Sequence, residues 1–359
     1  MHLLWLWWGV SPEVFGTPFR WYSLCFVAAF ALGHRLSVYL YKKAGAPEEW
    51  VDRQFTWVVL ATIVGARLGH VIFYDPGYYF TAEHWVEIFK IWEGGLASHG
   101  ATAALILTMY LNSKYITKKP MLWGIDKIVV IIALAAFFIR LGNLANSEIV
   151  GVPTSSKLGF VFFHPIKESL LLNLKGIEQV DFVALQKDTV VEGKSYQAAN
   201  MRLIFSEKEK QESVLEQTRK NAFYQIALFP REDANLKVFS LNQNIAVKRT
   251  EDKKWLSESL VWGMPRYPAQ LFEALFYLSV FILIWFGYTR WHWDKKMGFT
   301  SGLFLILVFG FRFIVEYWKE VQEAWEKDML LKQGQMLSIP FILIGIYFML
   351  ASFKTKNKP

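Results

Sequence analysis

Among the charged side chains that lie inside long apolar runs of the sequence, four are candidates for chemistry. A charge at the centre of a membrane helix costs at least about 2.5–3.5 kcal/mol, so each one needs a reason. Guanidinium is permanently charged and binds phosphate through two parallel hydrogen bonds. Three arginines at one membrane depth would therefore suit an anionic lipid headgroup, with or without chemistry on it. The four residues are Arg67, Arg140, Arg312 and Glu316.

A structural reading of these charges stays open. Arginines near the ends of spans can extend to the interface, and an arginine–glutamate pair can hold two helices together. Arg312 and Glu316 stand four positions apart, which predicts an ion pair on one helical face. Such a pair would either orient the guanidinium for a ligand or only stabilise the helix.

The run RLGNLANSE, from Arg140 to Glu148, is too polar for a lipid-facing helix. Helical spacing places Arg140, Asn143 and Ser147 on one face, with Asn146 and Glu148 at the helix end. We expect this run to face a polar cavity or partner helices.

A second motif, GGLASHGA at 94–101, places a histidine between glycines. Histidine titrates near neutral pH, so His99 is a candidate general base, with an interfacial anchor as the alternative. Tyr22, like His99, lies near the start of a predicted span. The single cysteine, Cys25, is expected to pack among apolar side chains. No set of His, Cys, Asp and Glu has metal-ligand spacing, so the sequence predicts no metal and no cofactor.

The composition is typical of a polytopic membrane protein. Of 359 residues, 53% are hydrophobic, 17% are aromatic and only 19% are charged, and the mean hydropathy is +0.23. A soluble domain carries about 25% charged residues. A span needs about 20 mostly apolar residues. The sequence predicts an all-α membrane protein with seven such helices, at 21–41, 55–74, 96–111, 125–146, 270–288, 301–318 and 336–353.

Basic loops predict the orientation of these spans. Lysine and arginine cluster after the first, third, fifth and seventh spans, and such short basic loops mark the cytoplasm. The C-terminus is therefore expected in the cytoplasm, with the N-terminus and the candidate site residues on the outer side. The net charge of +8 follows this topology, and no nucleic-acid motif accompanies it.

A long polar stretch predicts a small α+β extracytoplasmic domain between the fourth and fifth spans. The resulting parts are 1–149, 150–265 and 266–359. Within the domain, strand-like segments lie at 201–205, 224–229 and 236–247, and a charged helix is expected at 208–220. The Trp-rich segment 1–19 lacks a basic start, so it is predicted to lie at the interface rather than to be a cleaved signal peptide.

Several of these blocks occur in the order of one family, and the chain resembles bacterial prolipoprotein diacylglyceryl transferase. RLGNLANSE is similar to the family signature, with Ser147 where the family has glycine. GGLASHGA is similar to its histidine-glycine-glycine motif, with Ala101 in place of the second glycine. The outer domain is longer than the family usually carries. Further similar blocks are RWYS at 20–23, GARLG at 65–69, RYPAQ at 266–270, FRFIVE at 311–316 and GQMLSIP at 334–340.

The resemblance implies transfer of the diacylglyceryl group of phosphatidylglycerol to the lipobox cysteine of a preprolipoprotein, with a thioether formed and glycerol 1-phosphate released. It implies a multi-pass protein of the bacterial inner membrane, whose partners are the lipid bilayer and the signal peptide. Arg140 and Arg312 would stabilise the leaving phosphate in a water-poor site. His99 would assist deprotonation of the thiol or only position the headgroup. The implied substrate-binding residues are Tyr22, Arg67, Asn143, Asn146, Glu148 and Glu316, of which the two glutamates would orient arginines.

Two other classes of protein stay open. An anionic-phospholipid carrier or scramblase would use the same arginines without forming a bond, but it should offer polar residues through the whole membrane depth. A structural scaffold that binds partners through its outer domain would leave the arginines within the spans unexplained.

Overall fold

The computed structural model describes residues 5–91, 94–95, 97–205, 217–222, 226, 236–239, 247–250, 254–320 and 329–354. The chain divides into two compact units, each built from three segments. The sheet unit comprises Met1–Cys25, Ile139–Ala274 and Ile314–Gln333. The helical unit comprises Phe26–Phe138, Leu275–Phe313 and Gly334–Pro359. The predicted boundaries at 149/150 and 265/266 stay predictions.

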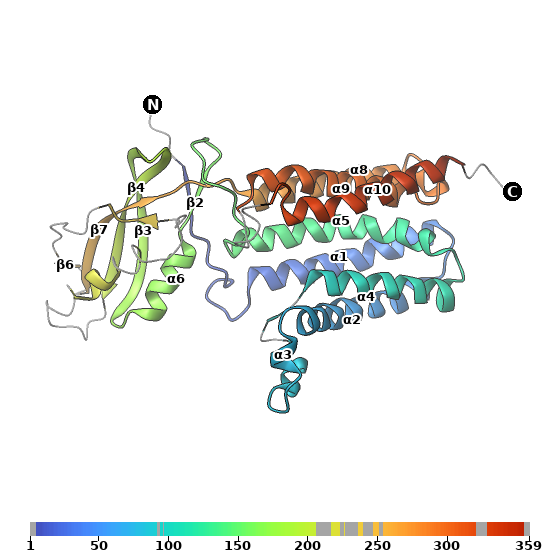
Figure 1. The fold of residues 1–359 in the computed structure, drawn as a ribbon, viewed down its shortest axis with the longest axis horizontal. Helices are drawn as coiled ribbons and strands as arrows, with labels where there is room; N and C mark the ends of the chain where they lie inside the picture. The colour runs from blue at the N-terminus through green and yellow to red at the C-terminus, as the bar shows by residue number, and fades with distance from the viewer. Residues whose placement is uncertain are drawn as a thin grey trace. The chain divides into compact units, whose positions relative to one another are not determined.

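Six helices of the described chain are long and apolar enough to cross a membrane. Within the helical unit they run side by side (Figure 1). They match six of the seven predicted spans, which confirms a polytopic and mainly helical membrane protein. They are α1 (Trp21–Lys43), α2 (Glu48–Phe73), α5 (Met121–Ala145), α8 (Ala269–Thr289), α9 (Phe299–Val315), continued by the 3-10 turn η5 (Glu316–Trp318), and α10 (Gln333–Lys354).

The remaining predicted span, 96–111, corresponds to a shorter helix. Helix α4 (Ser98–Leu111) has 14 residues. At about 1.5 Å per residue it is about 21 Å long, which is less than the hydrocarbon core of about 30 Å. A π-helical segment, η3 (Asn112–Thr117), continues it directly. The seventh span therefore stays a prediction. Between α2 and α4 lie the short helices α3 (Pro76–Tyr79) and η1 (Trp85–Phe89).

A buried carboxylate fixes the start of α9 in the helical unit. Asp126 on α5 accepts hydrogen bonds from the backbone of Gly298 (2.6 Å) and Ser301 (2.9 Å) and from the Ser301 hydroxyl (2.5 Å). These bonds satisfy amides that a helix start leaves without partners. The helix that carries Arg312 is thus anchored at its beginning. The helical unit also has a buried apolar cluster from α1, α5, α8 and α9, which consists of Leu40, Val129, Val130, Ala133, Val280, Ile284, Tyr288 and Phe304.

The sheet unit contains a five-stranded antiparallel sheet among its described residues. The strand order is β3-β4-β7-β5, and β6 also pairs with β7. Glu192 and Gly193 connect β3 to β4 with positive φ angles of 51° and 74°, as a two-residue hairpin requires. Helix α6 (His164–Asn173) adds Ile166 and Leu170 to the core of the sheet. The strands are β3 (Ile177–Val191), β4 (Lys194–Phe205), β5 (Leu236–Lys237), β6 (Val247–Arg249) and β7 (Trp255–Gly263).

The N-terminal segment contributes to this unit. Strand β1 (Leu6–Trp8) pairs in parallel with β2 (Phe160–Phe162), and Trp5 is 4% exposed in the core of the sheet unit. The sequence had predicted an interfacial segment and gave no sign of this pairing, because the partner strand lies about 150 positions away along the chain. The tryptophans therefore have structural contacts as well as any membrane role.

The strand predictions for the outer domain have mixed outcomes. The strand at 201–205 is confirmed as part of β4, and the ends of 236–247 form β5 and β6. The strand at 224–229 is wrong at Ile226, which is helical, and its other positions lie outside the described residues. Of the predicted helix 208–220, residues 217–220 are helical and the rest lies outside them.

Candidate functional site

The polar run after Arg140 ends helix α5 with a specific backbone motif. The amide of Ser147 donates to the carbonyl of Leu144 (3.1 Å), and that of Glu148 donates to the carbonyl of Asn143 (3.0 Å). This pair of bonds is a Schellman motif, in which the residue after the helix cap takes a left-handed conformation. Ser147 is that residue, with φ 55°. Glycine adopts this conformation without steric cost, which explains why the resembling family has glycine there.

This helix end gathers the predicted polar side chains of the run. Arg140 Nη1 donates to Asn143 Oδ1 (3.3 Å), and Asn143 Nδ2 donates to Glu148 Oε2 (3.2 Å). Asn146 Nδ2 donates to the other Glu148 oxygen (3.1 Å). The side chain of Gln270, on α8, donates to the backbone carbonyl of Glu148. Glu148 therefore holds both asparagines in place, and Asn143 in turn accepts from Arg140.

Tyr22 lies against the same stretch of α5. A Cβ on Gly142 would lie 2.6 Å from the Tyr22 ring, so only glycine allows this approach. The indole of Trp8 donates to the carbonyl of Leu144 (2.9 Å). Tyr22, expected near the start of a predicted span, thus lies beside the polar run within the sheet unit, and its role in binding substrate stays a prediction.

The segment after the run is also closely packed. A Cβ on Gly151 would lie 2.6 Å from the carbonyl oxygen of Tyr267 and 2.7 Å from that of Trp318. Arg266, fully buried, donates to the carbonyl of Gly151 (3.1 Å) and pairs with Glu320 (3.1 Å). These contacts hold the chain that leaves Glu148 against the segments at Tyr267 and Trp318.

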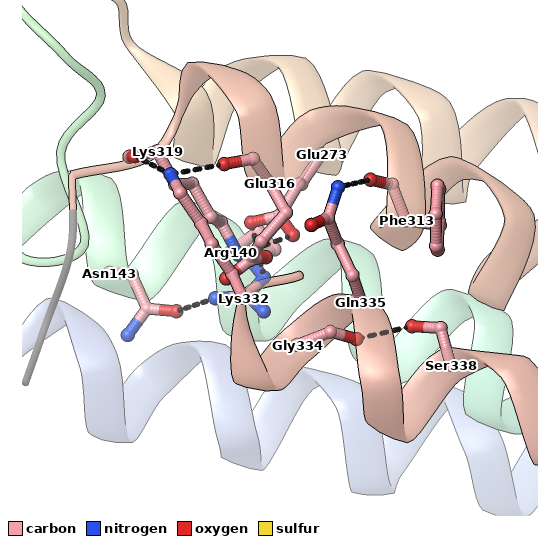
Figure 2. A network of polar contacts seen from close by, with 10 residues as sticks. All are labelled: Arg140, Asn143, Glu273, Phe313, Glu316, Lys319, Lys332, Gly334, Gln335 and Ser338. Carbon is pink, nitrogen blue, oxygen red and sulfur yellow. Dashed lines mark hydrogen bonds and ion pairs between the residues drawn. The ribbon is translucent and has the colours of Figure 1, made fainter. Parts of the chain in front are cut away.

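A buried carboxylate that the sequence analysis did not single out pairs with Arg140. Glu273, on α8, is 0% exposed, and its Oε2 lies 3.0 Å from Arg140 Nε. Its Oε1 lies 3.0 Å from Lys319 Nζ (Figure 2). Lys319 also approaches the carboxylate of Glu316 at 3.8 Å. Burial lowers the pKa of the Lys319 ammonium below its usual value. Within the sheet unit, positive and negative side chains thus alternate in the order Arg140, Glu273, Lys319 and Glu316.

Arg67, in the helical unit, is bound by backbone carbonyls. Its Nε donates to Ile88 (2.9 Å), its Nη1 to Gly94 (2.7 Å) and Gly95 (3.3 Å), and its Nη2 to Glu87. All three nitrogens are therefore engaged by the chain that precedes α4. The guanidinium thus braces the chain before α4, and its expected role in binding the headgroup stays a prediction.

His99 stands at the start of α4, beside a close contact between two helices. A Cβ on Gly100 would lie 2.2 Å from the carbonyl oxygen of Gly65, and one on Gly69 would lie 2.7 Å from Gly100 Cα. Small residues four apart on α2 thus let α4 approach. The exposed ring of His99 contacts Phe73 at a centroid distance of 5.1 Å.

Arg312, on α9, has a different environment from Arg67 and Arg140. Within the described residues it has no ion pair and no hydrogen bond, and its Nε is buried. Helix α9 ends at Val315, so Glu316 begins a 3-10 turn and falls outside the α-helical spacing on which the predicted Arg312–Glu316 pair rests. A partly buried guanidinium without a protein partner is suited to an anionic ligand.

A family model described as prolipoprotein diacylglyceryl transferase matches residues 12–351. The chain belongs to this family. Curated relatives, all named phosphatidylglycerol–prolipoprotein diacylglyceryl transferase, include a protein of Tolumonas auensis that is 31% identical over 98% of this chain and 100% of its own length. One from Porphyromonas gingivalis is 31% identical over 97% of this chain and 94% of its own length. One from Chloroherpeton thalassium is 27% identical over 97% and 95%, respectively.

In this member of the prolipoprotein diacylglyceryl transferase family, the predicted site residues divide between the two units. The helical unit carries Arg67, His99 and Arg312, and the sheet unit carries Tyr22, Arg140, Asn143, Asn146, Glu148 and Glu316. Sequence reasoning missed Glu273 and Lys319. Glu273 lies inside the predicted span 270–288, so the rule that selected the other charges also applies to it. Among the described residues, no group of three His, Cys, Asp or Glu side chains could hold a metal ion.

Proposed function

We propose that this chain transfers the diacylglyceryl group of phosphatidylglycerol to the cysteine thiol of a prolipoprotein. The names of its relatives supply the two substrates, and the family match extends over residues 12–351. The observation that carries the proposal is Arg312, a guanidinium on a membrane-spanning helix that has no partner among the described residues. An anionic lipid headgroup would supply that partner.

The reaction places definite demands on the site. The thiolate sulfur attacks the glyceryl carbon that bears the phosphate ester, a carbon–sulfur bond forms, and the carbon–oxygen bond to phosphate breaks. Glycerol 1-phosphate leaves with the bonding electrons, so negative charge grows on the phosphate. Preorganised donors stabilise such growing charge strongly in a site that excludes water. Arg140 and Arg312 are the proposed donors.

The thiol must lose its proton before it attacks. A cysteine thiol has a pKa of about 8.5, so a base increases the reactive fraction near neutral pH. We assign this role to His99, whose exposed ring lies at the start of α4. Arg67 would act on the same segment indirectly, because it braces the chain before α4 through backbone carbonyls.

The remaining predicted residues would arrange the headgroup and the arginines. Tyr22, Asn143 and Asn146 are proposed to hydrogen-bond the glycerol or the phosphate. Glu148 would hold the asparagines, as its contacts of 3.2 and 3.1 Å support. Glu316 would act on the charge of Lys319, at 3.8 Å, rather than on Arg312.

The placement in the membrane is part of the proposal. We propose a plasma-membrane protein of seven spans, with the helical path from α4 through η3 as the third of them. The N-terminus and the site would lie on the extracytoplasmic side and the C-terminus in the cytoplasm, following the basic loops. The enzyme would there meet the lipobox cysteine of an exported preprolipoprotein.

The test uses purified protein in detergent, phosphatidylglycerol labelled in its diacylglyceryl group, and a lipobox peptide. We expect label on the peptide and release of glycerol phosphate, both dependent on the peptide cysteine. Arg312→Lys should lose most of the activity, because a point charge does not replace the bidentate fork. Arg202→Lys, which alters an arginine paired with Glu258 in the outer sheet at 2.7 Å, serves as the matched control.

Three outcomes are informative. Transfer by the wild type with loss in Arg312→Lys alone supports the proposal. Equal activity of the two lysine variants would remove Arg312 from the site. Specific binding of phosphatidylglycerol without any thioether product, in folded protein, would favour the carrier.

A further inference from the structure

The Glu273 carboxylate lies between two cations and gives one oxygen to each. Oε2 lies 3.0 Å from Arg140 Nε and Oε1 lies 3.0 Å from Lys319 Nζ. Figure 2 draws the three side chains together. Glu273 is fully buried, and the side chains of Arg140 and Lys319 are 15% and 8% exposed. Water therefore screens these charges little, and the geometry of the three groups is strongly coupled.

This sharing determines which nitrogens of Arg140 stay available. A carboxylate that faces a guanidinium alone commonly binds two nitrogens in parallel. Here Glu273 contacts Nε, and Asn143 accepts from Nη1 at 3.3 Å. Among the described residues, no contact uses Nη2. The Nη2 group of Arg140 is thus available to donate a hydrogen bond to a phosphate oxygen.

Backbone contacts hold the turn that carries Lys319, whose ammonium lies beside Glu273 Oε1. Its backbone forms a β-bridge with Gly151, and its carbonyl accepts from Lys332 Nζ at 2.8 Å. Lys332 also donates to the carbonyl of Glu316 at 2.6 Å. The ammonium of Lys319 therefore stays beside Glu273 because the turn that carries it is tied on both sides.

We propose that Lys319 and Glu273 are positioning residues for Arg140. Lys319 retains one oxygen of Glu273, so that Glu273 orients the guanidinium through Nε and leaves Nη2 for a phosphate oxygen of the lipid headgroup. Without Lys319, Glu273 would bind Arg140 through both oxygens and compete with the lipid. The inference rests on the proposed function, because it names the lipid phosphate as the ligand.

The decisive experiment is a rescue. Lys319→Met should raise the KM for phosphatidylglycerol about tenfold with a smaller effect on kcat, because the freed carboxylate competes with the ground-state lipid. Adding Glu273→Gln should restore much of that loss, because the uncharged side chain keeps its place beside Arg140 Nε but no longer competes as an anion. A residue with a merely structural role would lose more activity in the double variant.

One control separates this effect from a general loosening of the fold. Lys254→Met removes an exposed lysine paired with Glu178 in the outer sheet at 2.8 Å, and it should leave the KM unchanged.

A second pair of variants covers the case in which Lys319→Met does not fold. With Lys319 kept, Glu273→Gln should retain at least tenfold more kcat/KM than Glu273→Leu, since leucine places no polar group beside Arg140 Nε to orient it. Equal values for these two variants would overturn the inference. An unchanged KM in folded Lys319→Met, or a double variant without rescue, would overturn it as well.

A binding measurement distinguishes failure of the inference from failure of the proposed function. Affinity is measured with nanodiscs that contain phosphatidylglycerol or only phosphatidylcholine. A wild type that binds phosphatidylglycerol but does not transfer its diacylglyceryl group would contradict the proposed function. The inference would still be tested, because the affinities of Lys319→Met and of the double variant show whether Glu273→Gln rescues binding. A wild type that transfers while Lys319→Met binds phosphatidylglycerol normally would contradict the inference alone.

Discussion

Replacing Ser147 with glycine should make the protein more stable. A left-handed conformation costs a residue with a side chain about 1–2 kcal/mol, and Ser147 has φ 55°. Its hydroxyl is buried without a hydrogen-bond partner among the described residues, which costs about a further 1–3 kcal/mol. Glycine removes both costs but loses about 0.5–1 kcal/mol more chain entropy on folding. We therefore expect Ser147→Gly to raise the free energy of unfolding by about 2 kcal/mol.

The assay is denaturant unfolding in detergent, followed by tryptophan fluorescence. The midpoint should rise while the slope stays the same, because only stability changes. Transfer activity should persist, since the Schellman bonds that place Asn143 and Glu148 are made by backbone groups. A midpoint equal to or below that of the wild type would refute this account of the helix end.

Two further variants divide the effect into its parts. Ser147→Ala keeps the backbone cost and removes the unpaired hydroxyl, so it should give a smaller gain than glycine. Ser279→Gly replaces a serine inside helix α8, whose hydroxyl donates to the carbonyl of Leu275 at 2.9 Å. There glycine should destabilise, because it weakens a helix interior. A gain at both sites would indicate a general effect of glycine rather than the strain at Ser147.

Three other predictions concern packing, the thiol and pH. Gly100→Ala should destabilise the protein by about 1–3 kcal/mol, because its Cβ would lie 2.2 Å from a backbone oxygen of α2. In the control Gly310→Ala the new Cβ meets nothing within 4 Å, so this variant should be neutral or slightly stabilising. The unfolding midpoints of the two variants are compared. Cys25→Ala should transfer label at a rate near that of the wild type, since the reacting thiol belongs to the peptide; a dead variant would contradict that chemistry. Burial lowers the pKa of His164, so the unfolded chain binds a proton at a higher pH than the folded chain does, and stability should fall as the pH drops below about 6.5. In His164→Gln the unfolding midpoint should depend less on pH between about pH 7 and pH 5.

Hydropathy predicted the membrane-spanning helices well because a span is defined by length and apolar composition. It predicted their ends less well. The predicted span 55–74 begins inside α2, whose first turn contains Glu48 and Glu49. Acidic residues suit the positive end of a helix, so the helix extends beyond the apolar run. The pattern thus identifies the part of a helix that suits lipid rather than the whole helix.

The polar run at the end of α5 was predictable because its residues are local. Helical spacing alone placed Arg140 and Asn143 on one face. The contacts of Arg67 were not predictable, because its partners are backbone carbonyls, such as that of Gly94 at 2.7 Å, and every residue has one. Which carbonyls meet a guanidinium depends on the tertiary path of the chain, so no residue type marks them.

Glu273 shows how charge balance refines the search for a site among apolar helices. A buried charge without a partner is expensive, so most charges in such a protein should occur in compensating groups. Arg140, Lys319 and Glu273 form such a group, with distances of 3.0 Å on both sides of the carboxylate. Arg312 lacks one among the described residues. In a membrane enzyme that binds an anion, the compensated charges fix the geometry, and the uncompensated charge indicates where the ligand supplies the missing partner.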